Sequence, residues 1–167
     1  MIHAENIRPF FRNLATLFGV GRARKAPGTW GTLAAVPVAV LFMLPGPFIF
    51  MALTVLTLVL AIVACDIHEQ DSGSHDSQQV VIDEVVGYLI AVTWLPFTWQ
   101  SFLAAFVLFR VFDIWKPLFI GMLDRKVHGG IGTVIDDLAA GLVVNIILQF
   151  VYYRTDWLGH QWAGGLG

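Results

Sequence analysis

Long uncharged stretches alternate with short polar segments along this chain, and the pattern predicts helices that cross a membrane. Residues 26–65 carry no charged side chain over 40 positions. A Pro-Gly-Pro sequence at 45–47 divides this run, because proline cannot continue a helix and glycine tolerates a turn. We therefore predict two spans, at 32–44 and 48–65. The first is shorter than the roughly 20 residues that a bilayer core requires, so we expect it to begin earlier or to lie tilted.

Three further apolar segments complete the predicted membrane region. Residues 85–95 and 100–109 form a second pair of predicted spans, and residues 138–153 form a fifth. The second pair is interrupted at Pro96 and the polar Thr98, where a helix is expected to stop. Each pair of spans would lead across the membrane and back.

The two ends of the chain differ from this apolar middle. Apolar residues at positions 10, 11, 14, 17 and 18 recur at helical spacing, which predicts an amphipathic surface helix in an N-terminal interfacial segment, residues 1–25. Residues 154–167 are expected to form a loose C-terminal tail. We therefore predict an all-α fold in a single domain, residues 1–167. It would be a multi-pass membrane helical bundle with short, partly broken helices and an N-terminal amphipathic helix.

Composition supports the membrane assignment. Hydrophobic residues make up 57% of the chain and charged residues 13%, and the mean hydropathy is +0.72. Soluble domains average about 45–50% apolar and about 25% charged residues. A net charge of −2 excludes a nucleic-acid binder, since no basic stripe is available to meet phosphate backbones. Cys65 has no second cysteine to pair with and ends an apolar run, which is typical of a buried, inert thiol.

The charge distribution predicts which ends of the spans meet. Five of the ten Lys and Arg residues lie within residues 1–25, so the N-terminus is expected in the cytoplasm. Threading five spans from that side brings residues 21–32, 66–79 and 110–137 to the same face. This convergence of polar segments is what a composite active site at the cytoplasmic surface would require.

Two pairs of acidic residues are the first candidates for chemistry. Asp83-Glu84 and Asp136-Asp137 each stand at the predicted start of an apolar helix. Hard divalent cations such as Mg²⁺ take oxygen ligands and often bridge to substrate phosphates, so the two pairs predict a Mg²⁺ site. Adjacent helical residues diverge by about 100°, so one member of a pair could face the site while the other caps a helix. A carboxylate at a helix start can also have no other role than a favourable interaction with the helix dipole.

Basic residues between the two acidic pairs are candidates for binding phosphate. Arg110, Asp113 and Lys116 lie at i, i+3 and i+6, which places them along one helical stripe. They form either a site for phosphate and metal or a ladder of ion pairs in which the three side chains neutralise one another. Intramembrane or membrane-edge ionisable residues in so apolar a chain favour a functional site.

The remaining candidates lie in two glycine-containing segments. Asp124, Arg125 and His128 precede a glycine-rich stretch whose backbone can approach a ligand closely. His128 alone would more often be structural, but beside an Arg and an Asp it could act as a general acid. In the other segment, APGTWGT, the hydroxyls of Thr29 and Thr32 just before a span suit a phosphate, and an ordinary helix cap is an equal alternative.

Three long strings in the sequence carry a resemblance to a known family. APGTWGTLAA, HDSQQVVIDEVVG and FRVFDIWKPLFIGMLDRKVHGGIGTVIDDLAAG closely resemble the phosphatidylglycerophosphatase A family of bacteria. The resemblance implies a multi-pass enzyme of the bacterial inner membrane that acts on a phospholipid. Its expected reaction is the Mg²⁺-dependent removal of the terminal phosphate of phosphatidylglycerophosphate. The sequence does not indicate an oligomeric state.

The resemblance and the residue chemistry together give each candidate a role. Metal binding is expected for the two acidic pairs, and phosphate binding for Arg110, Lys116, Arg125, Thr29 and Thr32. The expected catalytic residues are Asp113, Asp124, His128 and His75. The attacking group is either a metal-activated water or an aspartate that forms an aspartyl-phosphate, and the sequence does not separate the two.

Two functions from other classes compete with this hypothesis. A small membrane transporter or channel with a cation-binding carboxylate cluster would require ionisable groups near the bilayer centre and an inverted repeat. The charges instead lie at span ends, and the two halves of the chain do not match. A non-enzymatic assembly subunit would tolerate the substitution of Asp137 by Asn.

Overall fold

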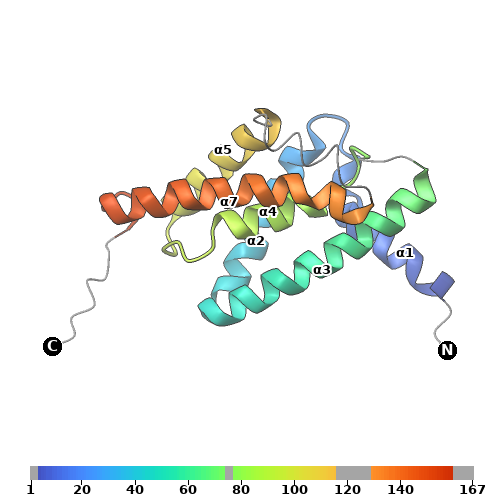
Figure 1. Ribbon diagram of the computed structural model, residues 1–167, viewed down its shortest axis with the longest axis horizontal. Helices are drawn as coiled ribbons and strands as arrows, with labels where there is room; N and C mark the ends of the chain where they lie inside the picture. The colour runs from blue at the N-terminus through green and yellow to red at the C-terminus, as the bar shows by residue number, and fades with distance from the viewer. Residues whose placement is uncertain (1–3, 74–76, 116–128, 160–167) are drawn as a thin grey trace.

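The computed structural model describes residues 4–73, 77–115 and 129–159, and this part of the chain contains helices and turns but no strand (Figure 1). The all-α prediction is confirmed. The elements are α1 (Ala4–Ala15), η1 (Leu17–Arg22), α2 (Pro27–Met43), α3 (Pro47–Ser72), α4 (Ile82–Ala91), α5 (Trp99–Trp115) and α7 (Gly130–Arg154).

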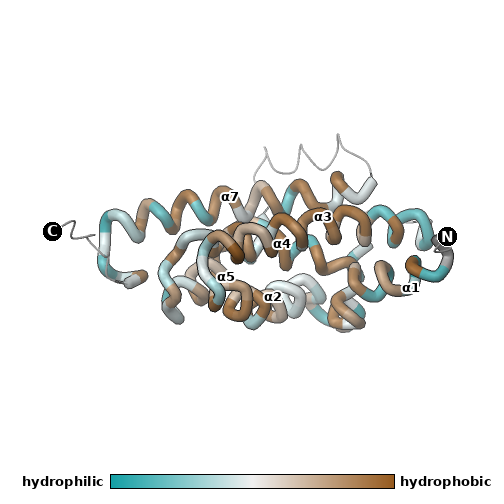
Figure 2. Tube along the Cα trace, turned by 90° about the horizontal axis from the view of Figure 1, so that it is seen from below, coloured by the Kyte–Doolittle hydropathy of each residue, from teal (hydrophilic) through white to brown (hydrophobic). Residues whose placement is uncertain are grey.

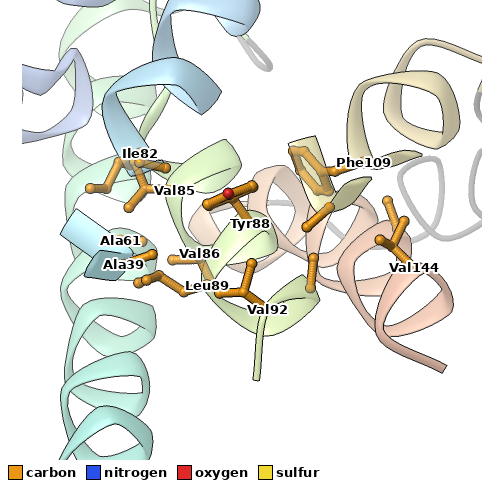
Figure 3. Packing of buried hydrophobic residues seen from close by; sticks show 14 of the residues in the cluster. Ala39, Ala61, Ile82, Val85, Val86, Tyr88, Leu89, Val92, Phe109 and Val144 are labelled. Carbon is orange, nitrogen blue, oxygen red and sulfur yellow. The ribbon is translucent and has the colours of Figure 1, made fainter. Parts of the chain in front are cut away.

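Helix α4 is the centre of the fold although it is only 10 residues long. It packs against α2, α3, α5 and most extensively α7. Figure 3 shows its apolar side chains meeting Ala39 and Ala61 on one side and Phe109 and Val144 on the other. Because α4 is covered on all sides, its buried residues, from Ile82 to Ala91, are almost continuously apolar, with Asp83 the charged exception.

Two glycines bring α4 and α7 into direct backbone contact. A Cβ atom on Gly141 would overlap the carbonyl of Gly87, and one on Gly87 would lie 2.7 Å from the carbonyl oxygen of Asp137. Small residues allow such close crossings where helices pack within an apolar environment. The contact fixes the spacing between Asp137 and the first turn of α4.

Helix α7 begins earlier than the sequence pattern predicts. The prediction placed Asp136 and Asp137 at a helix start, but the helix begins at Gly130, so the pair lies in its second turn. A Cβ atom on Gly130 would overlap the carbonyl of Ile62 on α3, and the Gly130 N–H donates to Asp66 Oδ1 at 3.5 Å. This close approach to α3 lets the helix extend through a glycine-rich stretch.

Helix α3 also continues past its predicted end, because the polar stretch that follows the apolar run remains helical as far as Ser72. Its last turn is held by the amphipathic helix α1, which packs alongside α3. Arg8 Nη2 donates to Asp71 Oδ1 at 2.6 Å, and Arg12 lies 3.9 Å from the other oxygen of the same carboxylate. The N-terminal helix is therefore anchored to the bundle by ion pairs.

Apolar residues occupy much of the length of the helices (Figure 2), and many of their side chains are exposed. Among the helices that the structure describes, two, α3 and α7, are long and apolar enough to cross a membrane, which suggests membrane association. Helix α4 is about 15 Å long at 1.5 Å per residue, half of a ~30 Å hydrocarbon core. Exposed apolar side chains include Val55, Leu56 and Val59 on α3, Leu103 and Val107 on α5, and Ile146 and Phe150 on α7.

The first residues after α7 pack against the bundle. Leu158, within the predicted loose tail, is fully buried. Its carbonyl accepts a hydrogen bond of 2.6 Å from Thr98 Oγ1, at the start of α5. This contact ties residues 155–159 to the start of α5.

Candidate active site

One polar cavity of about 410 Å³ collects residues that lie far apart in the sequence. Helices α4, α5 and α7 each contribute two charged side chains, and the segment leading into α2 and the segment before α4 complete the wall. The lining residues are Ala26, Pro27, Gly28, Ser77, Gln78, Val80, Asp83, Glu84, Arg110, Asp113, Asp136 and Asp137. The predicted convergence of the acidic pairs with Arg110 and Asp113 is therefore seen in the structure.

The pair on α4 stands in the first turn of that helix, and both carboxylates line the cavity. The Glu84 N–H donates to Asp83 Oδ1 at 3.0 Å, so Asp83 satisfies a backbone group at the helix start and still borders the cavity. Glu84 Oε1 lies 3.5 Å from Arg110 Nη1. Glu84 Oε2 is buried and has no hydrogen-bond partner among the described residues.

On α5, Arg110 and Asp113 form the tightest ion pair of the cavity. Arg110 Nη1 donates to Asp113 Oδ2 at 2.6 Å, as their i, i+3 spacing predicts. The same nitrogen is 3.5 Å from Thr32 Oγ1, whose hydroxyl donates to the Gly28 carbonyl at 3.0 Å. Arg110 Nε is buried without a partner in the described part of the chain. The guanidinium is thus oriented by its neighbours and keeps donor capacity for an anion.

On α7, Asp136 and Asp137 are buried, with 6% and 4% of their surfaces exposed. The Asp137 N–H donates to Asp136 Oδ1 at 3.0 Å, the same local arrangement as in the α4 pair. Helix α7 holds these residues beside α4 through the glycine contact described above. Buried charged side chains are usually paired or bind a metal ion, so these carboxylates are candidate metal ligands.

The charge balance of the cavity is strongly acidic. Its described lining contains five carboxylates and one guanidinium, that of Arg110. Burial, together with the neighbouring carboxylates of Asp83 and Asp113, raises the pKa of Glu84 to about 9, and Arg110 opposes the shift. Five neighbouring carboxylates repel one another, and a bound cation would relieve this repulsion.

The donor set fits a hard divalent cation, because it consists of carboxylate oxygens and includes a buried oxygen without a partner. Within residues 4–73, 77–115 and 129–159, however, no three His, Cys, Asp or Glu side chains are grouped closely enough to enclose a metal ion. Mg²⁺ usually keeps several waters and binds through one or two carboxylates together with substrate phosphates. The open arrangement matches that mode of binding better than a closed protein cage.

The two glycines of the APGTWGT segment, Gly28 and Gly31, explain how α2 approaches this cluster. A Cβ atom on either glycine would overlap a carboxylate oxygen of Glu84. The alternative that a threonine caps α2 is wrong, since the helix begins at Pro27 and both Thr29 and Thr32 lie inside it. Thr32 contacts Arg110, whereas Thr29 is not among the residues that line the cavity.

Comparison with known proteins places this arrangement in a family. The family model described as phosphatidylglycerophosphatase A matches residues 13–152. The chain belongs to the phosphatidylglycerophosphatase A family. A protein of this name from Escherichia coli K12 is 38% identical over 92% of this chain and 86% of its own length. One from Haemophilus influenzae is 41% identical over 84% of this chain and 87% of its own length.

A third relative, from Bacteroides thetaiotaomicron, is named a putative phosphatidylinositol-3-phosphatase. It is 37% identical over 81% of this chain and 89% of its own length. No solved structure matches the chain. All charged residues that line the cavity lie within the matched range of the family model, so the site belongs to the part of the chain that the family shares.

Some predicted residues lie outside the described part of the chain, and some lining residues were not predicted. His75, Lys116, Asp124, Arg125 and His128 fall outside the described residues, and their roles remain predictions. Ser77 and Gln78 line the cavity but had no predicted role. Their signals in the sequence were the HDSQQVVIDEVVG string, which contains both, and their position as polar, uncharged residues shortly before an apolar helix.

The close approach of Gly28 and Gly31 to the carboxylate of Glu84, which we call the glycine cradle, leads to a testable consequence. Gly31→Ala is expected to lower phosphatase activity about tenfold or more, because the added methyl group displaces Glu84 and overpacking of a close contact costs about 1–3 kcal/mol. Gly46→Ala, in the turn between α2 and α3, is the matched control: its φ of +109° makes alanine strained there, but it is far from the cavity. Equal activity per folded molecule in both variants would contradict the cradle.

Proposed function

We propose that this protein hydrolyses the terminal phosphomonoester of phosphatidylglycerophosphate to phosphatidylglycerol and inorganic phosphate, as a Mg²⁺-dependent step of phospholipid biosynthesis. The observation that carries the proposal is the cavity in which two acidic pairs from α4 and α7 face Arg110 on α5. Membership of the phosphatidylglycerophosphatase A family supports the substrate assignment. Carboxylates for a cation beside a guanidinium for an anion are the parts that metal-assisted phosphoryl transfer needs.

We assign Mg²⁺ binding to the acidic pairs Asp83-Glu84 and Asp136-Asp137. Support comes from their burial, from the excess of carboxylates over cations in the described lining, and from the Glu84 oxygen that has no hydrogen-bond partner among the described residues. When bound, Mg²⁺ would neutralise phosphoryl oxygens and lower the pKa of a water molecule. The transporter alternative has no comparable support, because the matched family and relatives bear phosphatase names.

The remaining described residues act on the substrate phosphate. Arg110 would bind the phosphoryl oxygens, since its guanidinium lines the cavity and keeps an unpartnered Nε. Asp113 holds that guanidinium at 2.6 Å, which makes it a positioning residue and leaves it one further oxygen for a proton or an ion. Thr32 supports Arg110 from α2.

Hydrolysis breaks the bond between phosphorus and the glycerol oxygen, and the leaving alkoxide takes up a proton. We propose His128 or His75 as the donor of that proton, and Lys116, Arg125 and Asp124 as further groups around the phosphate. Direct attack by water inverts the configuration at phosphorus, whereas an aspartyl-phosphate intermediate retains it through two displacements. A substrate with a chiral, isotopically labelled thiophosphate separates the two routes.

We further propose that the protein is a multi-pass protein of the bacterial inner membrane with its N-terminus and active site on the cytoplasmic side. The apolar surface of the bundle and the two long apolar helices support membrane insertion. The basic residues of the first 25 positions favour a cytoplasmic N-terminus. The cavity lies beside Gly28, close to that end of the chain.

The decisive experiment is phosphate release from phosphatidylglycerophosphate by the purified protein in detergent. We expect release in the presence of Mg²⁺, near-complete loss after treatment with a chelator, and recovery when Mg²⁺ is restored. Phosphatidylinositol 3-phosphate serves as the comparison substrate because one relative bears that activity in its name. Full activity in the chelator would remove the metal from the proposal, and a preference for the inositol lipid would overturn the substrate.

A further inference from the structure

A second polar cavity, of about 440 Å³, adjoins the acidic one. The two cavities share Pro27, Ser77 and Gln78 in their walls, so these residues separate two neighbouring compartments of one polar surface. The compartments differ in charge. The first is lined by five carboxylates and Arg110, whereas the charged residues lining the second are Arg22 and Arg24.

The two arginines of the second cavity are available to a ligand. Both side chains are exposed, and neither forms an ion pair or hydrogen bond with another described residue. Other arginines near this end of the molecule are engaged: Arg8 and Arg12 lie against Asp71, and Arg110 lies against Asp113. Two neighbouring cations that have no carboxylate partner in the described part of the chain create a local positive potential that attracts an anion.

Backbone contacts fix the position of this basic segment relative to the catalytic carboxylates. A Cβ atom on Gly21 would overlap the carbonyl of Gln79, just before α4. The Val81 N–H donates to the Ala15 carbonyl at 2.9 Å and joins the same two segments. The chain that carries Arg22 and Arg24 is therefore held against the residues that lead into Asp83.

Exposed aromatic residues flank the basic segment along the chain, four positions before Arg22 and six positions after Arg24. Phe18 is 70% exposed and has a φ of +52°, a conformation that non-glycine residues rarely adopt. Trp30, on the first turn of α2, is also exposed. Exposed aromatic side chains beside basic ones are typical of a surface at the level of lipid headgroups.

We propose that Arg22 and Arg24 form a second phosphate-binding subsite, which takes the phosphodiester of the lipid substrate while its terminal phosphate enters the acidic cavity. This inference rests on the proposed function. The substrate carries two phosphate groups joined by a glycerol unit, and its acyl chains follow the phosphodiester. The acidic cavity and the adjoining basic cavity match the neighbouring terminal phosphate and phosphodiester, and exposed aromatic residues that flank the basic segment along the chain suit the lipid part of the substrate. The subsite would thus select a lipid with an internal phosphodiester over a simple phosphomonoester.

The test measures two quantities in the Arg22→Gln/Arg24→Gln double variant in neutral detergent. We expect KM for phosphatidylglycerophosphate to rise about tenfold or more, the effect of losing charged hydrogen bonds, with kcat within about twofold because the terminal-phosphate site is intact. The inhibition constant of inorganic phosphate, which occupies only the acidic cavity, should not change. Melting temperature in the same detergent verifies folding.

Lys25→Gln is the matched control, because Lys25 is exposed in the same basic segment but does not line the cavity. We expect its KM to stay at the wild-type value. A rise in KM as large as in the double variant would mean that the arginines act only through a general electrostatic attraction to the lipid, and it would contradict a specific subsite. An unchanged KM in the double variant, or a parallel rise in the inhibition constant, would overturn the subsite. Failure of the wild-type protein to release phosphate would instead refute the proposed function.

Discussion

Asp137→Asn is expected to abolish phosphate release from phosphatidylglycerophosphate while the protein stays folded. The amide has nearly the shape of the carboxylate but removes a negative charge from the cavity, where Asp137 is buried on α7. Loss of one charge-stabilising group costs up to about a thousandfold in rate. Because the substitution also relieves repulsion among buried carboxylates, the melting temperature in the absence of Mg²⁺ should be retained or raised.

The matched control for this prediction is Asp156→Asn, just beyond the other end of the same helix. Asp156 is exposed and does not line the cavity. Activity and melting temperature should both remain at wild-type values in this control. Full activity of Asp137→Asn at saturating Mg²⁺ would remove Asp137 from the site and would favour the non-enzymatic alternative.

Arg110→Gln is expected to lower both activity and stability. The guanidinium is the one cation in the described lining of the cavity, and its removal leaves the carboxylates of Asp113 and Glu84 without a partner. We expect kcat/KM to fall about 10²- to 10³-fold. The free energy of unfolding should fall by about 1–3 kcal/mol, the cost of leaving a buried polar group unsatisfied. Phosphate release and thermal unfolding in detergent measure the two effects.

A double variant separates the catalytic contribution of Arg110 from its structural one. Combining Arg110→Gln with Glu84→Gln removes one negative charge along with the positive one, so much of the lost stability should return. Activity should not return, because the substrate phosphate still lacks the guanidinium and the proposed metal site lacks the Glu84 carboxylate. If activity recovers together with stability, Arg110 supports the fold and does not bind phosphate.

The helices could be predicted well from the sequence because uncharged runs and proline breaks are local signals. The Pro-Gly-Pro break falls between α2, which ends at Met43, and α3, which begins at Pro47. Helix ends were less predictable where tertiary contacts decide them. Gly130 begins α7 because it meets the carbonyl of Ile62, a residue far away in the sequence, and no local pattern reports that contact.

The site could be predicted in outline, because acidic pairs in an apolar chain have few structural uses. Asp83, Glu84, Asp136 and Asp137 do line one cavity. Their spacing could not be predicted, since it depends on the backbone contact between Gly87 and Gly141. The role of the basic segment was not predictable either, because residues 22–24 resemble any positively charged cytoplasmic end until their cavity is seen.

The backbone contact between α4 and α7 also bears on how this protein could change over evolution. Gly87 and Gly141 set the gap between the carboxylate pairs from inside the bundle, whereas α3 and the outer face of α7 turn apolar side chains outward. Replacing those outward side chains to suit a thicker or thinner bilayer leaves the internal gap untouched. Lineages with different lipids can therefore remodel the exterior freely, while an insertion or deletion between Glu84 and Gly87 would shift the reactive groups out of register.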